Sequence, residues 1–435
     1  MFSTLEYRMH RRTVIAQGRW QKTAGVMFSI ALSAVTTSLF AQAAAKPERL
    51  TLGQAFDAAW SQQPEVASLA MRRDAAQAHQ RAAKAWTPEP PALEVTGKTD
   101  RLGSSLGTRE YEIGLTVPLW LPRERGSSQA LAEAESRAVE SRTTAAQLRV
   151  AAAVREAWWN WQRAAVELAT AQDQLDSAQR IALDVGKRLK AGDLARADQH
   201  QADGAVAAAQ ATVAGAEAAS SVARQALAAL MATPATHAKL TLAEPYAEPT
   251  PDPSPIDLSA HGDFQWLRDR AAVAQGVVAL TATQSRASPE LKIATTRGRG
   301  AAGEAWQQTV TVGVRIPFGA GPRYDARLAA ARAESVELEA LMTLERARLS
   351  GERDTAKARV EAARLQLVAA DRRAQLARES RGFFDKSFRL GESDLPTRLR
   401  IEAEATDADR QAARARIELA AAISAWRQAL GLLPQ

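Results

Sequence analysis

The chain has 435 residues, no cysteine and a formal net charge of +7. The absence of cysteine excludes disulfide bonds, thiolate metal sites, a cysteine nucleophile and a lipid-bearing cysteine at a mature N-terminus. A surplus of four positive charges lies before residue 44. That leaves about +3 for the remaining chain, so the net charge is weak evidence for nucleic-acid binding and no nucleic-acid partner is expected.

Residues 1–43 have the pattern of an export signal. Basic residues precede an apolar run at 24–40, and a small-x-small cleavage site follows at 41–43. We expect cleavage after Ala43 or Ala45. An uncleaved anchor is the alternative, because the run approaches the roughly 17 residues that a membrane-crossing helix needs. In either case the chain leaves the cytoplasm.

The first half of the mature chain, residues 44–240, is predicted to combine helices with two strands. Apolar residues at i, i+3 and i+4 spacing indicate a helix that ends near Trp86, before a proline-rich turn. The elements expected after it are strands at 93–96 and 109–117, a long helix at 123–189 and a second helix at 195–231.

Residues 241–256 contain five prolines and are predicted to form an extended linker. The plan of the first half then recurs in residues 257–435. Its expected elements are a helix at 257–286, strands at 290–297 and 307–316, a long helix at 322–389 and a last helix that ends at Gly431.

The recurrence indicates a duplicated half-protein. The segment Tyr111-Glu-Ile-Gly-Leu-Thr-Val-Pro118 aligns with Val310-Thr-Val-Gly-Val-Arg-Ile-Pro317 at an offset of 199 residues, and Gly192 aligns with Gly391 at the same offset. Solenoid units are only roughly 20–50 residues long. The two halves are therefore interpreted as one architecture made twice.

The helix lengths predict a mainly α fold with a small β part. At about 1.5 Å per residue, the long helix of the first copy spans on the order of 100 Å. The helix before the strands and the helix after the glycine turn together span about the same length. We therefore expect the two shorter helices to lie end to end along the long one, with strands at one end and glycine turns at the other.

The second strand of each copy alternates apolar and polar residues in phase. The apolar positions are Tyr111, Ile113, Leu115 and Val117 in the first copy and Val310, Val312, Val314 and Ile316 in the second. Each strand has roughly the nine to eleven residues that cross a bilayer at a tilt. Near the strand ends lie aromatic residues that would suit a membrane interface, namely Trp86, Trp120, Trp306 and Phe318.

This alternation favours strands that face lipid. The alternative is a two-sided sheet packed on a soluble core, but the adjacent helices are too charged to cover it. Four strands cannot close a barrel in lipid, because open edges leave backbone groups unpaired. Chains must therefore assemble, and two copies would supply eight strands or three copies twelve.

Several motifs occur in order along the mature chain. They are Leu50-Thr-Leu-Gly-Gln-Ala-Phe-Asp-Ala-Ala-Trp60, the strand–Pro–helix junctions at Pro118 and Pro317, the turns Arg188-Leu-Lys-Ala-Gly192 and Phe388-Arg-Leu-Gly391, and the terminal Gln428-Ala-Leu-Gly-Leu-Leu-Pro434. In this order the chain resembles the TolC family of outer-membrane efflux proteins over nearly its whole mature length. The resemblance implies a homotrimer, with a 12-stranded β-barrel in outer-membrane lipid and an α-barrel of long antiparallel helices crossing the periplasm.

The resemblance also implies a function. The chain would be a passive exit duct, with neither enzymatic activity nor a cofactor, that works with a periplasmic adaptor and an inner-membrane pump of the RND type. It looks most like the cobalt–zinc–cadmium efflux branch, given its compact length, its Pro118-Leu-Trp-Leu-Pro-Arg-Glu-Arg125 junction and its Gly391-Glu-Ser-Asp-Leu turn. The same scaffold serves drug efflux and type I protein secretion, and both remain alternatives.

In the family, the glycine turns lie at the periplasmic tip. The resemblance therefore implies an adaptor contact at Leu189, Gly192, Leu194, Leu390, Gly391 and Leu395. Some members carry two aspartates six and nine residues past the second turn glycine, but here those positions hold Thr397 and Arg400. Asp198, Glu392 and Asp394 remain candidates for a pore constriction, because a ring of carboxylates favours cations. Alternatively, Asp198 and Asp394 only begin their helices.

The remaining candidates have ordinary interpretations. Trp158, Trp159 and Trp161 suit core packing better than a docking surface. The scattered histidines His79, His200, His237 and His261 form no His-x-x-x-His pair, so no metal site is expected. The segment Gly298-Arg-Gly-Ala-Ala-Gly303 lacks a phosphate-loop ending and suits a loop tip. The rival class of function is a periplasmic coiled-coil adaptor or structural protein.

Overall fold

The computed structural model describes residues 50–103, 106–232, 248–252, 257–319 and 321–435. They belong to one compact unit that runs from Pro47 to Gln435. The predicted export signal lies outside the described residues, as do most residues of the predicted linker.

In the first half, two helices precede the strands where the sequence predicts one. α1 spans Leu52–Ser61 and α2 spans Pro64–Lys84. The prediction of a single helix is wrong because Pro64 has no backbone N–H and cannot continue α1. It takes the first position of α2 instead. The elements that follow are β1 (Ala92–Thr99), β2 (Arg109–Pro118), α3 (Glu124–Ala191) and α4 (Arg196–Leu230).

The second half has the same succession of elements. They are a short 3-10 helix η1 (Leu258–Ala260), α5 (Gly262–Thr283), β3 (Glu290–Arg299), β4 (Gln307–Arg315), α6 (Gly321–Arg389) and α7 (Leu395–Ala429). The long helices α3 and α6 contain 68 and 69 residues. Each is therefore on the order of 100 Å long.

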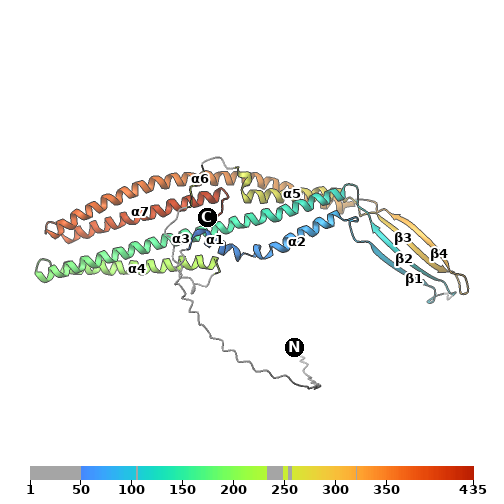
Figure 1. Ribbon diagram of the computed structural model, residues 1–435, viewed down its shortest axis with the longest axis horizontal. Coiled ribbons are helices and arrows are strands. Elements are labelled where there is room, and N and C mark those ends of the chain that lie inside the picture. Colours follow the sequence, from blue (N-terminus) through green and yellow to red (C-terminus); the bar gives the residue numbers. More distant parts are fainter. Residues whose placement is uncertain (1–49, 104–105, 233–247, 253–256, 320) are drawn as a thin grey trace, which may run out of the picture. The chain divides into compact units, whose positions relative to one another are not determined.

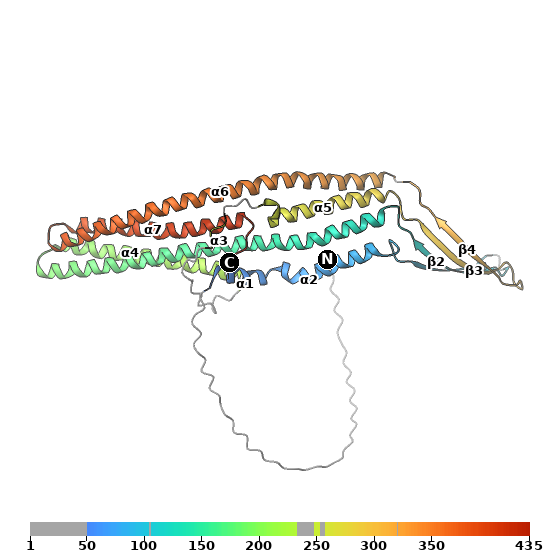
Figure 2. The ribbon, with the colours of Figure 1, turned by 45° about the horizontal axis from the view of Figure 1, so that its top comes forward.

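Each long helix carries the shorter helices of its own half in succession. α3 packs against α1 and α2 over one part of its length and against α4 over the other, and α6 packs likewise against α5 and α7 (Figures 1 and 2). This is the end-to-end arrangement that the helix lengths predict. α3 also packs against α5 and α7, which joins the two halves into one bundle.

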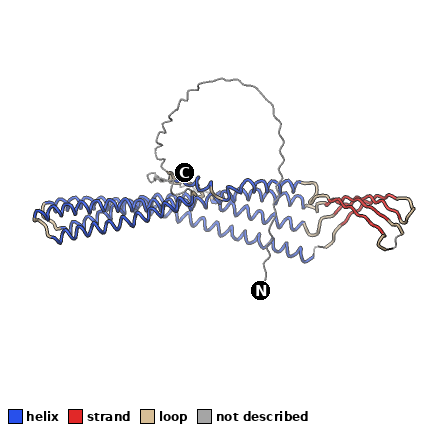
Figure 3. Tube along the Cα trace, turned by 90° about the horizontal axis from the view of Figure 1, so that it is seen from below, coloured by secondary structure: helices blue, strands red, loops and turns tan. Residues whose placement is uncertain are grey.

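The four strands form one antiparallel sheet at one end of the helices, in the order β1-β2-β3-β4 (Figure 3). The central pair, β2 and β3, comes from different halves of the chain, and Gly114 lies opposite Ala294. A Cβ at Gly114 would lie 3.3 Å from the Cβ of Ala294, so glycine allows the two strands to approach closely there. The predicted fold class, mainly α with a small β part, is confirmed.

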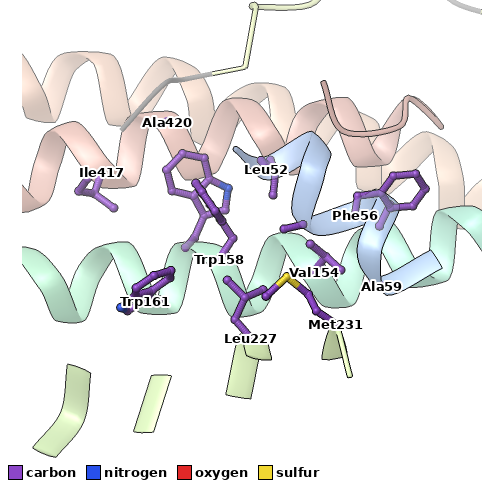
Figure 4. Close-up of a cluster of buried hydrophobic side chains, with 13 residues drawn as sticks. Leu52, Phe56, Ala59, Val154, Trp158, Trp161, Leu227, Met231, Ile417 and Ala420 are labelled. Atoms are coloured by element: carbon purple, nitrogen blue, oxygen red, sulfur yellow. The ribbon is translucent and has the colours of Figure 1, made fainter. Parts of the chain in front are cut away.

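A hydrophobic cluster lies where α1 and the C-terminal end of α4 meet α3 and α7 (Figure 4). Trp158, Trp161, Leu227 and Ile417 are each at most 5% exposed in it. The rings of Trp158 and Trp161 meet edge to face with centroids 6.4 Å apart. Full burial of one large apolar side chain contributes about 1.5–3 kcal/mol. The tryptophans are therefore core residues, as predicted, and not a docking surface.

The described part of the linker is anchored rather than merely extended. Residues 248–252 have no regular secondary structure, but Glu248 is buried between α3 and α7. Its Oε1 accepts hydrogen bonds from Arg155 Nη2 at 2.8 Å and from Arg427 Nε at 3.1 Å, and Ser424 donates to its Oε2. The two buried guanidinium groups need a carboxylate between them, and this segment supplies it.

Candidate functional site

One face of the sheet carries apolar side chains in register across all four strands. Leu93, Leu115, Ile293 and Val312 are paired in a single row. Each of the four is between 43% and 70% exposed. The rows on either side add further exposed apolar residues on the same face, among them Val95, Ile113, Val310 and Val314. A contiguous apolar surface of this kind marks a membrane or protein interaction site.

The opposite face of the sheet is polar and ion-paired. Lys292 Nζ of β3 lies 2.8 Å from Glu112 Oε1 of β2 and 3.3 Å from Glu94 Oε2 of β1. Arg315 of β4 lies 3.5 Å from Glu290 of β3. The two faces therefore differ as the sequence alternation predicts, and the sheet separates an apolar side from a charged side.

The sheet is open at both edges. Among the described residues, β1 and β4 each pair with one strand only. Each outer edge therefore presents unpaired backbone N–H and C=O groups. An apolar face with open edges can enter lipid only if other strands close the sheet into a barrel.

Aromatic residues lie at both ends of the apolar face. At the end near the helices, Trp86 is 94% exposed and Phe318 is 87% exposed, while Trp120 donates its Nε1–H to Ala85 O. At the far end, the ring of Trp306 stacks on that of Tyr111 with centroids 6.0 Å apart. Aromatic residues of membrane proteins concentrate at the two membrane–water interfaces, so this placement agrees with the predicted girdle.

The helix turns at the other end of the bundle share one backbone geometry. Gly192 has φ +88° and Gly391 has φ +78°, in the left-handed region that favours glycine. Asp193 N–H donates to Arg188 O, and Glu392 N–H donates to Ser387 O, both at 2.9 Å. Both turns are thus Schellman motifs that satisfy the last carbonyl groups of a long helix. The sequence repeat is also a structural repeat here.

The two candidate constriction aspartates both bond to helix starts. Asp198 Oδ2 accepts the Ala195 N–H at 2.9 Å, and Asp394 Oδ1 accepts the Thr397 N–H at 3.0 Å. Hydrogen bonds from the Thr397 side chain and backbone lower the pKa of Asp394 below its ordinary value. A capping box has two such hydrogen bonds, and each copy has one of them: Asp198 accepts from the residue before its helix, and Asp394 accepts from the third residue of its helix. These contacts favour the helix-start interpretation for both aspartates.

Arginines join the two turn regions. Arg188 of α3 donates to Phe388 O at 2.9 Å. Arg398 of α7 donates to Asp385 Oδ1 at 2.7 Å and to Asp184 Oδ2 at 3.3 Å. Both guanidinium groups lie 4.7 Å from the centroid of the Phe388 ring. Arg188 and Arg398 were not predicted as site residues. Arg188 and Phe388 are the first residues of the two equivalent turn motifs, and this correspondence could have indicated that they interact.

The predicted contact residues at the tip differ in exposure. Leu390 is 74% exposed, and both turn glycines are exposed, whereas Leu189 and Leu194 are half-buried. Leu395 is only 1% exposed, because it packs with Phe388 and other apolar residues beneath the turns. The assignment of Leu395 to a contact surface is therefore corrected, since it belongs to the core of the tip.

The other constriction candidates lie close to the second turn. Glu392 is exposed and Thr397 is half-buried. Arg400 is exposed and pairs with Glu404 at 2.6 Å along α7. The charge of Arg400 is therefore partly offset by an acid of its own helix.

Metal-ligand geometry was sought in the part of the chain that the structure describes. There, no group of three or more His, Asp or Glu side chains is arranged to hold a metal ion, and His237 lies outside that part. None of the helices within the same part is long and apolar enough to cross a membrane.

The chain has recognisable relatives. Residues 55–233 match the model of the family described as outer membrane efflux protein. The outer membrane protein VceC of Vibrio cholerae is 18% identical, with a TM-score of 0.70 over 87% of this chain and 96% of that chain. CusC is 17% identical, with a TM-score of 0.71 over 88% and 92%. The Campylobacter jejuni outer membrane channel CmeC is 15% identical, with a TM-score of 0.69 over 88% and 86%. No curated protein matches the sequence.

At these identities the solved structures show a shared fold, which is that of TolC-like channels. The family model matches part of the first half of the chain, and the shared fold extends over most of the chain. An efflux duct of this family is not an enzyme, in agreement with the prediction. None of the comparisons singles out the metal-efflux branch.

Proposed function

We propose that the protein is the outer-membrane channel of a tripartite efflux system. The observation that carries the proposal is the sheet, whose apolar side chains lie in exposed rows on one face while its charged side chains pair on the other. In a closed barrel the apolar face would meet lipid and the charged face would line water. A periplasmic adaptor or structural protein would have no use for such rows.

Closure sets the assembly that we propose. Each chain supplies four strands with two open edges. Single-chain bacterial barrels have eight strands or more. A homotrimer would supply twelve, with β1 of one subunit pairing β4 of the next, so that no edge remains in lipid. The helices, which continue from the sheet, would form the tunnel through the periplasm.

We place the partners at the turns. The exposed tip residues Gly192, Leu390 and Gly391 would contact the helices of a periplasmic adaptor, which would link the channel to an inner-membrane pump of the RND type. Opening of the tunnel would require α3, α6 and α7 to separate where Arg188 and Arg398 now join them. The adaptor would drive this by binding the open tip more tightly than the closed one.

We propose divalent metal cations as the cargo, with drugs or secreted proteins as the alternatives. The support is the residue pattern of the strand–helix junction and of the second turn. Three copies of Asp198, Glu392 and Asp394 would bring carboxylates near one mouth, which favours cations. The capping bonds of the two aspartates do not remove their charge.

Cell fractionation tests the channel directly. The mature protein should be found in the outer-membrane fraction, and on gels it should run as a trimer that heating converts to a monomer. In planar bilayers the purified trimer should conduct ions. A soluble periplasmic protein serves as the fractionation control. A fully folded, water-soluble monomer would contradict the proposal.

A further inference from the structure

Three arginines lie on the apolar face of the sheet, at its end away from the helices. Arg109 of β2 pairs with Arg299 of β3, and Tyr111 pairs with Arg297. Paired residues and residues two apart along a strand share a face. Arg109, Arg297 and Arg299 therefore point to the same side as Ile113, beyond the apolar rows. Arginine on a lipid-facing surface requires an explanation, because it is costly within hydrocarbon.

Aromatic rings hold two of these arginines in place. The guanidinium carbons of Arg297 and Arg299 lie 5.5 and 5.3 Å from the centroid of the Trp306 ring. The ring of Tyr111 stacks against the same tryptophan. The arrangement presents planar guanidinium groups beside an aromatic residue of the interfacial kind.

The cluster has no anion of its own in the described part of the chain. There, none of the three arginines has a carboxylate oxygen within ion-pair distance, and the buried Nε of Arg299 has no hydrogen-bond partner. The nearby Glu304 accepts the N–H groups of Gly300 and Ala301 within its own loop. Like charges this close, without a counter-charge, favour an external anion.

The position of the cluster identifies the kind of anion. Six residues separate Leu291, in the apolar rows near the helices, from Arg297. At about 3.3 Å per residue the arginines lie on the order of 20 Å further along the strand. With the helices in the periplasm, this end of the sheet lies at the outer leaflet. An anion bound there would lie at the height of the lipid headgroups. If the anion is part of a lipid, the acyl chains of that lipid would lie beside Val310 and Val312.

We propose that Arg109, Arg297 and Arg299, with Trp306, form a binding site for the phosphate groups of a phosphorylated glycolipid in the outer leaflet. Guanidinium groups bind phosphate through paired hydrogen bonds. The neighbouring apolar rows supply the surface that a free phosphate ion would not use. This inference rests on the proposed channel function, because it needs the sheet to lie in the outer membrane.

Lipid binding to the purified full-length trimer tests the site. The probe is diphosphorylated lipid A in detergent, compared by native mass spectrometry with the same lipid after removal of both phosphates. The wild-type protein should prefer the phosphorylated form. Arg297→Gln with Arg299→Gln should weaken that binding by about tenfold or more, because two charge-assisted contacts are lost, and should leave the dephosphorylated lipid unaffected.

Matched variants keep the result interpretable. Arg142→Gln with Arg224→Gln removes the same charge from exposed helix positions and should bind as the wild type does. Arg297→Lys with Arg299→Lys keeps the charge but loses the paired hydrogen bonds of the guanidinium groups, so it should bind more weakly than the wild type. Each variant is first shown to form the heat-sensitive trimer.

Three outcomes would overturn the inference. They are equal binding by the wild type and the glutamine variant, a lysine variant that binds as tightly as the wild type, and displacement of the lipid by millimolar inorganic phosphate, which would indicate a free-anion site. A protein that does not fractionate with the outer membrane refutes the channel itself. A channel in the outer membrane that binds lipid without this dependence refutes only the lipid site.

Discussion

The buried charge cluster around Glu248 gives the sharpest prediction for stability. Glu248 is 3% exposed, and its partners Arg155 and Arg427 are 4% and 5% exposed. They come from the linker, α3 and α7, which are far apart in the sequence. We predict that Glu248→Gln destabilises the folded protein strongly, although it changes only one atom of the side chain.

The magnitude follows from the contacts that the carboxylate makes. Arg155 donates two hydrogen bonds to it, at 2.8 and 3.2 Å, Arg427 donates one at 3.1 Å, and Ser424 donates another. An amide keeps one acceptor oxygen but turns an NH2 group toward a guanidinium and leaves two buried cations uncompensated. Removing one partner of a buried ion pair costs about 3–5 kcal/mol.

The assay is urea unfolding of the detergent-solubilised protein, followed by pulse proteolysis. The matched control is Glu140→Gln, which removes a carboxylate paired with Arg73 at 2.6 Å on the surface, where both side chains are about half exposed. Surface pairs contribute about 0–1 kcal/mol. A loss below about 1 kcal/mol for Glu248→Gln, equal to that of the control, would refute the anchoring of the linker by this cluster.

Three further predictions concern the turns. Asp198→Asn keeps an acceptor for the helix start but removes the charge, so it should reduce cation preference in planar bilayers; an unchanged reversal potential would assign Asp198 to capping alone. Arg398→Gln removes two partly exposed ion pairs between the tip helices, worth about 1–2 kcal/mol together, and should raise the open-to-closed ratio roughly 5- to 30-fold. Unchanged single-channel opening would contradict that role. Because folding lowers the pKa of Asp394, its contribution to stability is present above the ordinary aspartate pKa and is lost as pH falls through the lowered value. Protection against amide exchange in the first turn of α7, relative to the intrinsic exchange rate at each pH, should therefore fall in acid, and Asp394→Asn should remove that dependence; the same acid response in both proteins would argue against the cap.

The features that the sequence predicts correctly are those with local physical causes. Strand alternation depends on a period of two residues, and the turn glycines are needed for a positive φ that other residues rarely adopt. The duplication is identified because the strand segment and the turn glycine both recur at an offset of 199 residues. The number of residues in an uninterrupted helix determines its length in Å. The summed lengths of the two shorter helices equal about the length of the long helix, which predicts their end-to-end packing.

The features that the sequence does not predict depend on contacts across the fold. Glu248 looks like any charged residue in a proline-rich segment, because its partners lie in α3 and α7 and no spacing rule connects them. Leu395 resembles an exposed residue just after a turn, yet it packs in one cluster with Phe388 of α6 and Val185 of α3. The break between α1 and α2 is different, since Pro64 marks it plainly and the sequence prediction gave too much weight to apolar spacing.

The most direct test of the central claim is which side of the sheet meets lipid. The chain has no cysteine, so single cysteines at Leu115, Thr116, Val310 and Thr311 can each carry a unique spin label in reconstituted membranes. Labels at Leu115 and Val310 should be accessible to oxygen dissolved in lipid, and labels at Thr116 and Thr311 to a water-soluble nickel chelate. Four labels that meet only water, or that show no alternation along either strand, would contradict a membrane channel.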